Sequence, residues 1–288
     1  AASDVYKRQL PGIVVDLYGA FAVIRTYTAS VAGLVSTIAG ALHAQSRLRG
    51  ILQRHLQDEP AVLWGQLPPR DLTIEEHGLL FHADLAAGQK TGLYCDQREN
   101  RLYLASLCQN RDLLDCFCYA GAFSLYAVRG GARSITACDA AGAAITAAKM
   151  NFALNGFDPK QHTFIARDCF ELLEEYGRQG RRFDLVILDP PSFARDRKGR
   201  RTAERAYVRL NRLALDCVVP GGLLASASCT SQVSPQTFRE ALAEAARKAG
   251  RRLLAIHDSG QPLDHPVPAH FPEARYLKFV VSRVLPIS

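Results

Sequence analysis

The feature that most constrains the fold is a regular alternation of apolar runs and helix-like stretches that begins near Arg111. Each apolar run has the length of a strand, and a helical segment or a turn separates it from the next. Strands that alternate with helices build a mainly parallel sheet with right-handed crossovers. We therefore predict a doubly wound, seven-stranded α/β domain over residues 107–288. Its strands are expected at 113–118, 135–138, 164–166, 184–188, 223–228, 253–256 and 276–284.

Two helices of this domain have clear signals in the sequence. An alanine-rich periodicity predicts a helix over about residues 141–154. Ser234 followed by Pro235 predicts a second helix that ends near Lys248. Serine is favoured at the helix N-cap and proline at the first helical position.

The N-terminal third has a mixed pattern. Two pairs of short apolar runs predict β-hairpins, at 13–16 with 21–26 and at 72–74 with 79–82. Residues 30–57 show helix-like spacing of apolar side chains. A polar, charged loop is expected over 88–101. We predict a small α+β accessory domain over residues 10–106.

The first nine residues need a separate interpretation. Residues 4–9 read Asp-Val-Tyr-Lys-Arg-Gln, which one reading frame of a common transposase mosaic-end sequencing adapter encodes. We interpret residues 1–9 as an adapter scar on a chain whose native N-terminus is missing, and we exclude them from the fold prediction. The alternative is a natural, poorly ordered terminus.

Composition bounds the class of protein. The chain has 288 residues, 48% of them hydrophobic, which is enough to bury a sizeable core. No apolar run is long enough to span a membrane. The eight cysteines show no C-x-x-C spacing, so we expect no zinc or other metal site. Several lie in apolar runs, where reduced cysteine behaves as a small hydrophobe, and a cytoplasmic location fits them best.

Basic charge is concentrated in one segment. The chain has a formal net charge of +7, and residues 195–212 hold eight basic side chains against two acidic ones. If this segment is helical, Arg205, Arg209 and Arg212 share one face. The segment is compatible with binding to nucleic-acid phosphates. Read alone, it fits an ordinary solvated basic helix equally well.

Acidic side chains follow three successive strands, at the sheet edge where doubly wound folds bind ligands. Asp115 and Gly121 bound the first turn, where a glycine lets the backbone approach a cofactor closely. Asp139 ends the second strand, where an acid can take both ribose hydroxyls, and Asp168 is placed to accept from an adenine amino group. One acid alone would be a solvated strand end or a helix cap, but three with a glycine turn predict a nucleoside cofactor. The turn lacks G-x-G-x-x-G, which argues against a dinucleotide.

The sharpest local signal is the segment Asp189-Pro190-Pro191-Ser192-Phe193. Two prolines fix a rigid turn and remove two backbone donors, which leaves nearby carbonyls free to face a ligand. Phe193 offers a flat apolar surface on which a base can stack. The alternative is a simple stop between strand and loop. Such a stop needs neither the acid nor the aromatic residue, so we favour a substrate site.

Cys229 differs from the other cysteines because it follows a predicted strand among hydroxyl residues. A thiolate there would be solvated and stabilised. The alternative is a buried cysteine that fills space in the core. Position favours a nucleophile.

Together, several motifs resemble the large-subunit ribosomal RNA methyltransferase I family, which are bacterial cytosine-C5 enzymes. The resemblance runs from about Leu10 to Val284. It rests on the segments 89–92, 96–101, 115–121, 189–193, 228–229, 264–266 and 271–278. It implies a class I, Rossmann-like S-adenosylmethionine (SAM) methyltransferase domain with large-subunit rRNA as partner. It also implies that the loop 89–101 closes over cofactor and target.

The resemblance assigns roles residue by residue. Asp139 is expected on the ribose of SAM, Asp168 near its adenine, and Cys229 as nucleophile with Asp189 as second catalytic residue. The candidate cofactor-binding residues are Gln97, Arg98, Asp115, Phe117, Tyr119, Gly121, Asp139, Asp168, Cys169 and Asp189. The candidate substrate-binding residues are Lys90, Pro190, Pro191, Ser192, Phe193, Arg205 and Arg209.

The chain departs from the family pattern in places. Members carry an N-terminal PUA-type RNA-binding domain that this chain lacks, and truncation at the adapter would explain that. Ala120 stands where threonine is expected, and Ser192 stands where some other RNA cytosine-C5 enzymes keep a second cysteine. Two alternative functions stay open. One is an N-methyltransferase on guanine or adenine, and the other is a non-catalytic RNA-binding protein that retains SAM.

Overall fold

The computed structural model describes residues 2–3, 12–45, 47–54, 61–85, 93–194, 196, 198–267, 269–270 and 274–287. The chain divides into two compact units, one of residues 1–98 with 262–272 and one of residues 99–261 with 273–288. The division falls eight residues before the boundary predicted at 106/107. The smaller unit also takes in residues 262–272, which the sequence pattern places in the larger domain. Each unit is described by itself.

The smaller unit is built on a five-stranded sheet in the order β1-β2-β3-β4-β5. β2 and β3 form the predicted hairpin, and β4 runs parallel to β3. Apolar side chains of the sheet, among them Ile13 and Ile24, pack against Val35 and Leu42 of α1. The elements are β1 (Ala2–Ser3), β2 (Ile13–Tyr18), β3 (Phe21–Thr26), η1 (Ala29–Leu34), α1 (Val35–Gln45), β4 (Gly50–Arg54) and β5 (Ala61–Gly65).

The helix predicted over 30–57 is wrong in its second half. Helical structure ends at Gln45, and residues 50–54 form strand β4. Ile51 and Leu52 of β4 are fully buried beside β3. Apolar spacing alone does not separate a helix from a short buried strand, so tertiary pairing decides this segment. The second predicted hairpin is confirmed as β6 (Thr73–Glu76) and β7 (Leu79–His82).

The larger unit contains the predicted seven-stranded sheet. Its order is β10-β9-β8-β11-β12-β14-β13. The first five strands in this order are parallel, and β14 is antiparallel to both of its neighbours. The strands are β8 (Asp112–Cys116), β9 (Ser134–Asp139), β10 (Thr163–Ala166), β11 (Phe183–Leu188), β12 (Val218–Ser228), β13 (Arg251–Ser259) and β14 (Lys278–Pro286).

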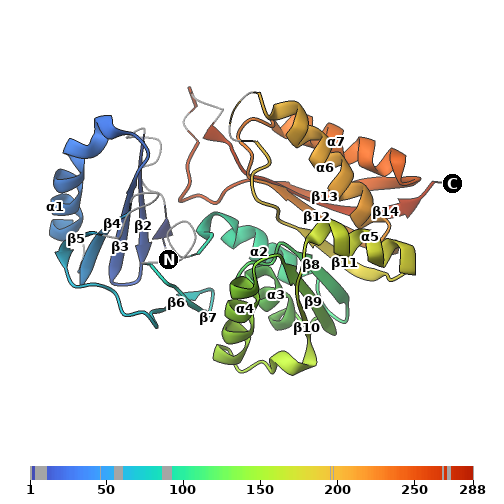
Figure 1. The fold of residues 1–288 in the computed structure, drawn as a ribbon, viewed down its shortest axis with the longest axis horizontal. Coiled ribbons are helices and arrows are strands. Elements are labelled where there is room, and N and C mark those ends of the chain that lie inside the picture. The colour runs from blue at the N-terminus through green and yellow to red at the C-terminus, as the bar shows by residue number, and fades with distance from the viewer. Residues whose placement is uncertain are drawn as a thin grey trace. The chain divides into compact units, whose positions relative to one another are not determined.

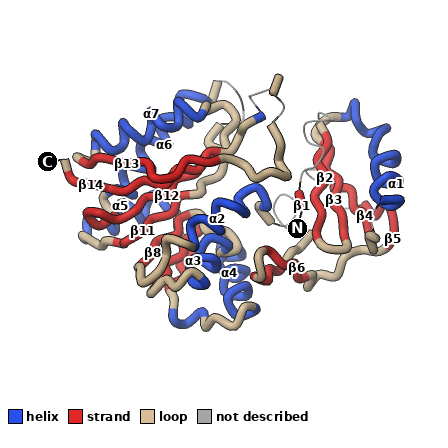
Figure 2. Tube along the Cα trace, turned by 180° about the vertical axis from the view of Figure 1, so that it is seen from behind, coloured by secondary structure: helices blue, strands red, loops and turns tan. Residues whose placement is uncertain are grey.

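Helices cover both faces of this sheet (Figures 1 and 2). α3 and α4 lie on one face, and α5, α6 and α7 lie on the other. Ser234 caps α7 by accepting from the Thr237 N–H, with Pro235 at the first position, as predicted. The helices are α2 (Arg98–Ala105), α3 (Ala122–Arg129), α4 (Gly142–Leu154), η3 (Pro159–Gln161), α5 (Cys169–Gln179), α6 (Arg200–Leu215) and α7 (Pro235–Lys248), with η2 (Cys95–Gln97) before α2. Part of the loop predicted over 88–101 is therefore helical, and residues 88–92 lie outside the described residues.

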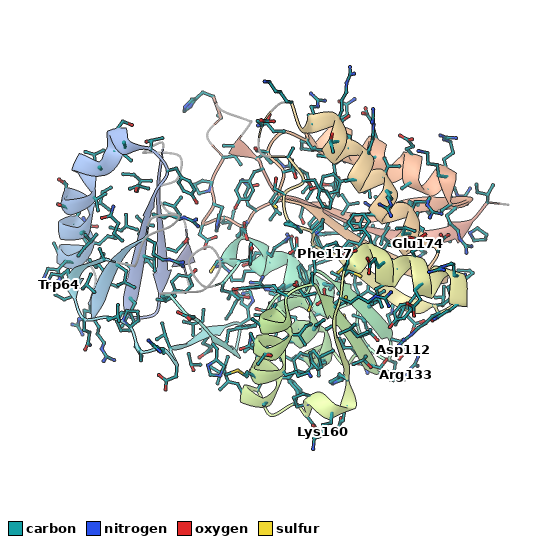
Figure 3. All side chains as sticks on the ribbon, in the orientation of Figure 1. Trp64, Asp112, Phe117, Arg133, Lys160 and Glu174 are labelled. Carbon is teal, nitrogen blue, oxygen red and sulfur yellow. The ribbon has the colours of Figure 1, made fainter. Side chains whose placement is uncertain are left out.

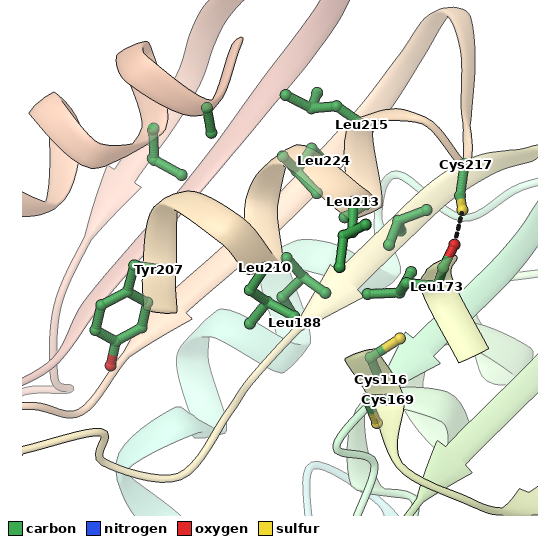
Figure 4. Packing of buried hydrophobic residues seen from close by; sticks show 14 of the residues in the cluster. Cys116, Cys169, Leu173, Leu188, Tyr207, Leu210, Leu213, Leu215, Cys217 and Leu224 are labelled. Atoms are coloured by element: carbon green, nitrogen blue, oxygen red, sulfur yellow. Dashed lines mark hydrogen bonds between the residues drawn. The ribbon is translucent and has the colours of Figure 1, made fainter. Parts of the chain in front are cut away.

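The larger core lies between the sheet and helices α5–α7 (Figure 4). Leu210 and Leu213 of α6 pack with Leu188 and Leu224 of the neighbouring strands. Each such side chain contributes about 1.5–3 kcal/mol when fully buried. The Cys217 thiol donates to the Leu173 carbonyl at 3.5 Å. Seven of the eight cysteines are buried, as expected of small apolar residues, and only Cys229 is partly exposed.

The parallel strands all end at one edge of the sheet. Figure 3 shows Phe117 after the end of β8, while Asp112 and Arg133 lie together at the opposite edge. There the Arg133 guanidinium pairs with both Asp112 and Asp184. No helix within the described part of the chain is both long and apolar enough to cross a membrane.

Candidate functional site

Asp115, near the end of β8, is the most deeply buried acid of the site. Its side chain is 1% exposed. Oδ2 accepts from the Ser124 hydroxyl at 2.6 Å and from the Ser124 N–H at 3.1 Å. Oδ1 is buried without a hydrogen-bond partner among the described residues. Burial raises the pKa of Asp115 to about 7, partly offset by the Ser124 hydrogen bonds. A buried carboxylate oxygen of this kind is suited to a cationic donor.

The turn after β8 is tightly wound. Phe117, Tyr119 and Gly121 have positive φ angles of 64°, 47° and 73°. Such angles are uncommon for residues other than glycine and often occur at functional sites. A Cβ on Gly121 would lie 2.8 Å from the Cβ of Ala148 in α4. Gly121 therefore allows the turn to pack closely against α4. Its close approach to a cofactor stays a prediction.

Asp139 holds this turn from the end of β9. Its Oδ2 accepts from the Tyr119 N–H at 3.0 Å, and Oδ1 accepts from the Ala141 N–H at 2.9 Å. Each carboxylate oxygen has two acceptor positions. Both oxygens therefore keep capacity for a further donor, such as a hydroxyl. Geometry of this kind fits the predicted contact with a ribose.

Asp168 is the N-cap of α5. Its Oδ1 accepts from the N–H groups of Phe170 at 2.8 Å and Glu171 at 3.1 Å. The side chain is exposed, so Oδ2 is open to a donor from outside. Cys169 behind it is buried, and its sulfur accepts from the Phe117 N–H at 3.2 Å. Asp168 is thus a helix cap that can also face a ligand, whereas Cys169 supports the β8 turn from inside.

Gln97 and Arg98 belong to the smaller unit. Gln97 is buried in η2. The Arg98 guanidinium donates to Asp264 Oδ2 at 3.0 Å. Lys90 lies outside the described residues. Contact of these three residues with a cofactor or substrate stays a prediction.

The Asp-Pro-Pro turn and the Cys229 loop meet at the ends of β11 and β12. Cys229 is partly exposed, and its Sγ lies 3.9 Å from the Pro190 carbonyl oxygen. Pro191 and Ser192 are exposed. The structure therefore brings together the two segments that the sequence singled out, although they lie 39 residues apart.

Thr230 joins these segments to α6. Its hydroxyl lies 2.7 Å from the Tyr207 phenol and 3.2 Å from the Ser192 hydroxyl. It also accepts from the Phe193 N–H at 3.3 Å. The Phe193 ring is half-buried, with its centroid 4.9 Å from that of Tyr207. The inner side of Phe193 therefore packs on protein, and its exposed remainder is the part available to a base.

Sequence reasoning missed Lys278, at the start of β14. Its side chain is 2% exposed, and Nζ donates to the carbonyls of Thr230 at 2.7 Å and Tyr276 at 2.8 Å. Burial lowers the pKa of Lys278 to about 8; Arg275 acts in the same direction and Cys229 in the opposite one. Two signals were available: Lys278 stands at the start of an apolar run, and it ends the segment 271–278 that carries part of the family resemblance.

A basic groove of about 550 Å³ lies between α6 and α7. Residues 200–215 are helical, so Arg205, Arg209 and Arg212 share one face as predicted. Arg195 and Arg197 lie outside the described residues. Two of the three arginines are near acids, since Arg212 pairs with Asp216 at 3.1 Å and Arg209 lies 3.9 Å from Glu174. The groove is lined by Arg201, Glu204, Arg205, Val208, Arg209, Arg212, Glu244 and Lys248.

Comparison with known proteins identifies relatives of this chain. Residues 25–269 match the model of a family described as S-adenosylmethionine-dependent methyltransferase. The chain is 36% identical over 284 residues to the ribosomal RNA large subunit methyltransferase I of Alteromonas mediterranea, covering 96% of this chain and 71% of that protein. It is 37% identical over 287 residues to the protein of that name from Vibrio cholerae, covering 96% and 72%.

Solved structures share the fold. A SAM-dependent methyltransferase from Streptococcus mutans superposes with a TM-score of 0.86 at 24% identity, over 94% of this chain and 71% of that one. The tRNA m1G37 methyltransferase of M. jannaschii gives a TM-score of 0.65 at 18% identity, over 95% and 72%.

Proposed function

The chain belongs to the S-adenosylmethionine-dependent methyltransferases, and among them to the ribosomal RNA large subunit methyltransferase I family; from this we propose that it methylates C5 of a cytosine in large-subunit rRNA. The observation that carries the proposal is the position of Cys229. Its thiol is the only partly exposed one of eight, and it lies at a strand end against the Asp-Pro-Pro turn. A nucleophile needs such a place, whereas a cysteine that only fills the core does not.

The residues at the ends of β8, β9 and β10 fit SAM. The unpartnered Oδ1 of Asp115 suits the α-ammonium group of its methionine part. Asp139 can accept from the ribose hydroxyls and Asp168 from the adenine amino group. When bound, SAM supplies an electrophilic methyl group. We propose that Gln97, at the end of η2, and Arg98, at the start of α2, add further cofactor contacts, and that Lys90 contacts the substrate.

Cys229 acts on the base from the end of β12. The target cytosine leaves its stack to reach the pocket between the Asp189 and Cys229 loops. The thiolate adds to C6, and the electron pair of the C5–C6 double bond makes C5 nucleophilic. After methylation a base removes the C5 proton, and Cys229 is eliminated with return of the electron pair to the ring.

Asp189 and Phe193 hold the cytosine during this sequence. In its protonated form, the Asp189 carboxyl supports N3 by donating a hydrogen bond as negative charge develops there. The exposed part of Phe193 stacks on the base. The rigid Pro190-Pro191 turn fixes both groups relative to Cys229.

The groove between α6 and α7 binds RNA phosphates in this proposal. Arg205 and Arg209 lie in it, with Arg201 and Lys248 beside them. Five cations against two glutamates line the groove, and this excess of positive charge suits a phosphate backbone. The partial pairing of Arg209 with Glu174 does not prevent this, since exposed ion pairs contribute little.

Nucleoside mass spectrometry tests the reaction. Unmodified bacterial large-subunit rRNA is incubated with SAM and either the unaltered chain, Cys229→Ala, or Cys217→Ala as a matched control in the core. We expect 5-methylcytidine from the unaltered chain and the control, and none from Cys229→Ala. A methylated purine made by all three would instead assign an N-methyltransferase. Binding of SAM and RNA without product would assign the non-catalytic function.

A further inference from the structure

Lys278 is a buried cation beside the cysteine of the site. We propose that Lys278 is a positioning residue whose ammonium group holds Cys229 in its thiolate form. The inference rests on the proposed role of Cys229 as nucleophile. Neither the sequence motifs nor the comparisons assign a role to this lysine.

The sheet places the lysine next to the cysteine. β12 and β14 pair antiparallel, with Lys278 directly opposite Ser228, the residue before Cys229. The Lys278 ammonium then donates to the carbonyl of Thr230, the residue after Cys229, at 2.7 Å. The Lys278 backbone thus pairs with Ser228 on one side of the thiol, and the Lys278 ammonium binds the Thr230 carbonyl on the other side. Strand pairing fixes the Lys278 backbone, and the bonds to the carbonyls of Thr230 and Tyr276 hold the ammonium group in place.

Burial makes this cation significant. A lysine at 2% exposure loses most of its hydration, which is costly unless hydrogen bonds and a nearby negative charge compensate. Two of its three N–H groups donate to carbonyl oxygens, which carry partial negative charge. The negative charge of a Cys229 thiolate favours the ammonium form of Lys278, whereas burial and the charge of Arg275 oppose it. Such coupling is mutual, so the ammonium favours the thiolate by the same free energy.

The other groups that face Cys229 do not replace Lys278. Tyr207 of α6 is coupled to Cys229, but burial raises the pKa of its phenol to about 12, so it stays neutral near pH 7. Asp189, after β11, also acts on Tyr207, and in its ionised form it opposes a thiolate. Arg275 precedes β14 and acts on Lys278. The ammonium of Lys278 therefore balances the carboxylate of Asp189.

The Lys278 ammonium promotes one step of the proposed reaction, the addition of the Cys229 thiolate to cytosine. The thiol proton leaves to solvent before the base arrives, because the ammonium stabilises the resulting anion. The sulfur lone pair then forms the S–C6 bond, and the C5–C6 electron pair is displaced onto C5 and N3. The proton balance requires no transfer from Lys278, which stays protonated and acts through its charge.

Site-resolved alkylation tests the inference without methyl transfer. The full chain is treated with iodoacetamide across pH 6–10, and modification of Cys229 is followed by peptide mass spectrometry. We expect the midpoint for the unaltered chain to lie below about 8.5, the usual thiol value. In Lys278→Met the midpoint should rise by about one unit, a roughly tenfold slower alkylation at pH 7. Lys278→Arg should keep the low midpoint.

The controls separate charge from fold. Arg283→Met removes a cation from the same strand, where Arg283 donates to the Gly221 carbonyl; its profile should match the unaltered chain. A folded Lys278→Met with an unchanged midpoint would overturn the inference. If that variant does not fold, a midpoint of 8.5 or above in the unaltered chain overturns it. Failure of the proposed function is a separate result, seen as continued activity of Cys229→Ala.

Discussion

The hydroxyl of Thr230 lies 2.7 Å from the phenol of Tyr207, and this buried hydrogen bond joins α6 to the loop that carries Cys229. The Phe193 N–H donates to the same hydroxyl, so one oxygen binds both segments of the proposed substrate site. A small polar side chain therefore sets the spacing between the Asp-Pro-Pro turn and the cysteine.

Thr230→Val should lower both stability and activity. Valine keeps the volume but removes one of the two side-chain partners of the Tyr207 hydroxyl, which keeps Ser228, and leaves the Phe193 N–H without the Thr230 oxygen. An unsatisfied buried donor costs about 1–3 kcal/mol in free energy of unfolding. Urea denaturation measures the loss, and methyl transfer should slow in parallel. Thr146→Val, which loses an exposed hydroxyl bond to Gly142 in α4, should change stability by no more than about 0.5 kcal/mol. Equal effects at the two positions would contradict the bridging role.

Asp115 predicts a particular pH dependence. Its folded-state pKa of about 7 lies above the ordinary value of 3.8. The folded chain therefore holds a proton that the unfolded chain loses, and the free energy of unfolding falls as pH rises from about 4 to 7. Asp115→Asn removes this contribution, so the free energy of unfolding of the variant should fall less between about pH 4 and 7. Urea titrations at several pH values measure the slopes, and identical slopes would refute the assignment.

The two roles of Asp168 can be separated by substitution. Asp168→Ala loses the cap of α5 and should cost about 0.5–2 kcal/mol in free energy of unfolding. Asp168→Ser keeps a capping oxygen, so its stability should stay close to that of the unaltered chain. Both should bind SAM at least tenfold more weakly in calorimetry, because a charged hydrogen bond of about 1.5–3 kcal/mol is lost. Unchanged SAM affinity of the serine variant would leave Asp168 as a cap alone.

Salt dependence of RNA binding tests the groove. Neutralising Arg205, Arg209 and Arg212 to glutamine should reduce the slope of log K against log salt by about 2, as expected for three lost phosphate contacts on single-stranded RNA. A charge-matched control changes Arg251, Arg252 and Arg283 on β13 and β14. That control should leave the slope nearly unaltered. An equal fall in both variants would mean that net charge, not the groove, drives binding.

Most of the larger unit was predictable because its strands are short apolar runs between helices. Each of the seven runs is a strand, and the acids at 115, 139 and 168 lie where the pattern placed them. The segment at Ile51 was not predictable, since its partner β3 decides between helix and strand. Lys278 and Thr230 were missed for a related reason. They lie 48 residues apart, and only the register of β12 against β14 brings them together.

The place of β14 between β12 and β13 has a consequence for the order of folding. Within the described chain β13 joins the sheet only through β14, so β13 can take its place only once β14 is there to pair with it. The parallel strands β8 to β11 have no such requirement. During refolding, the half that we propose binds the nucleoside can therefore form early, while Cys229 gains Lys278 only when β14 pairs with β12. Recovery of cofactor binding should precede recovery of thiol reactivity in time.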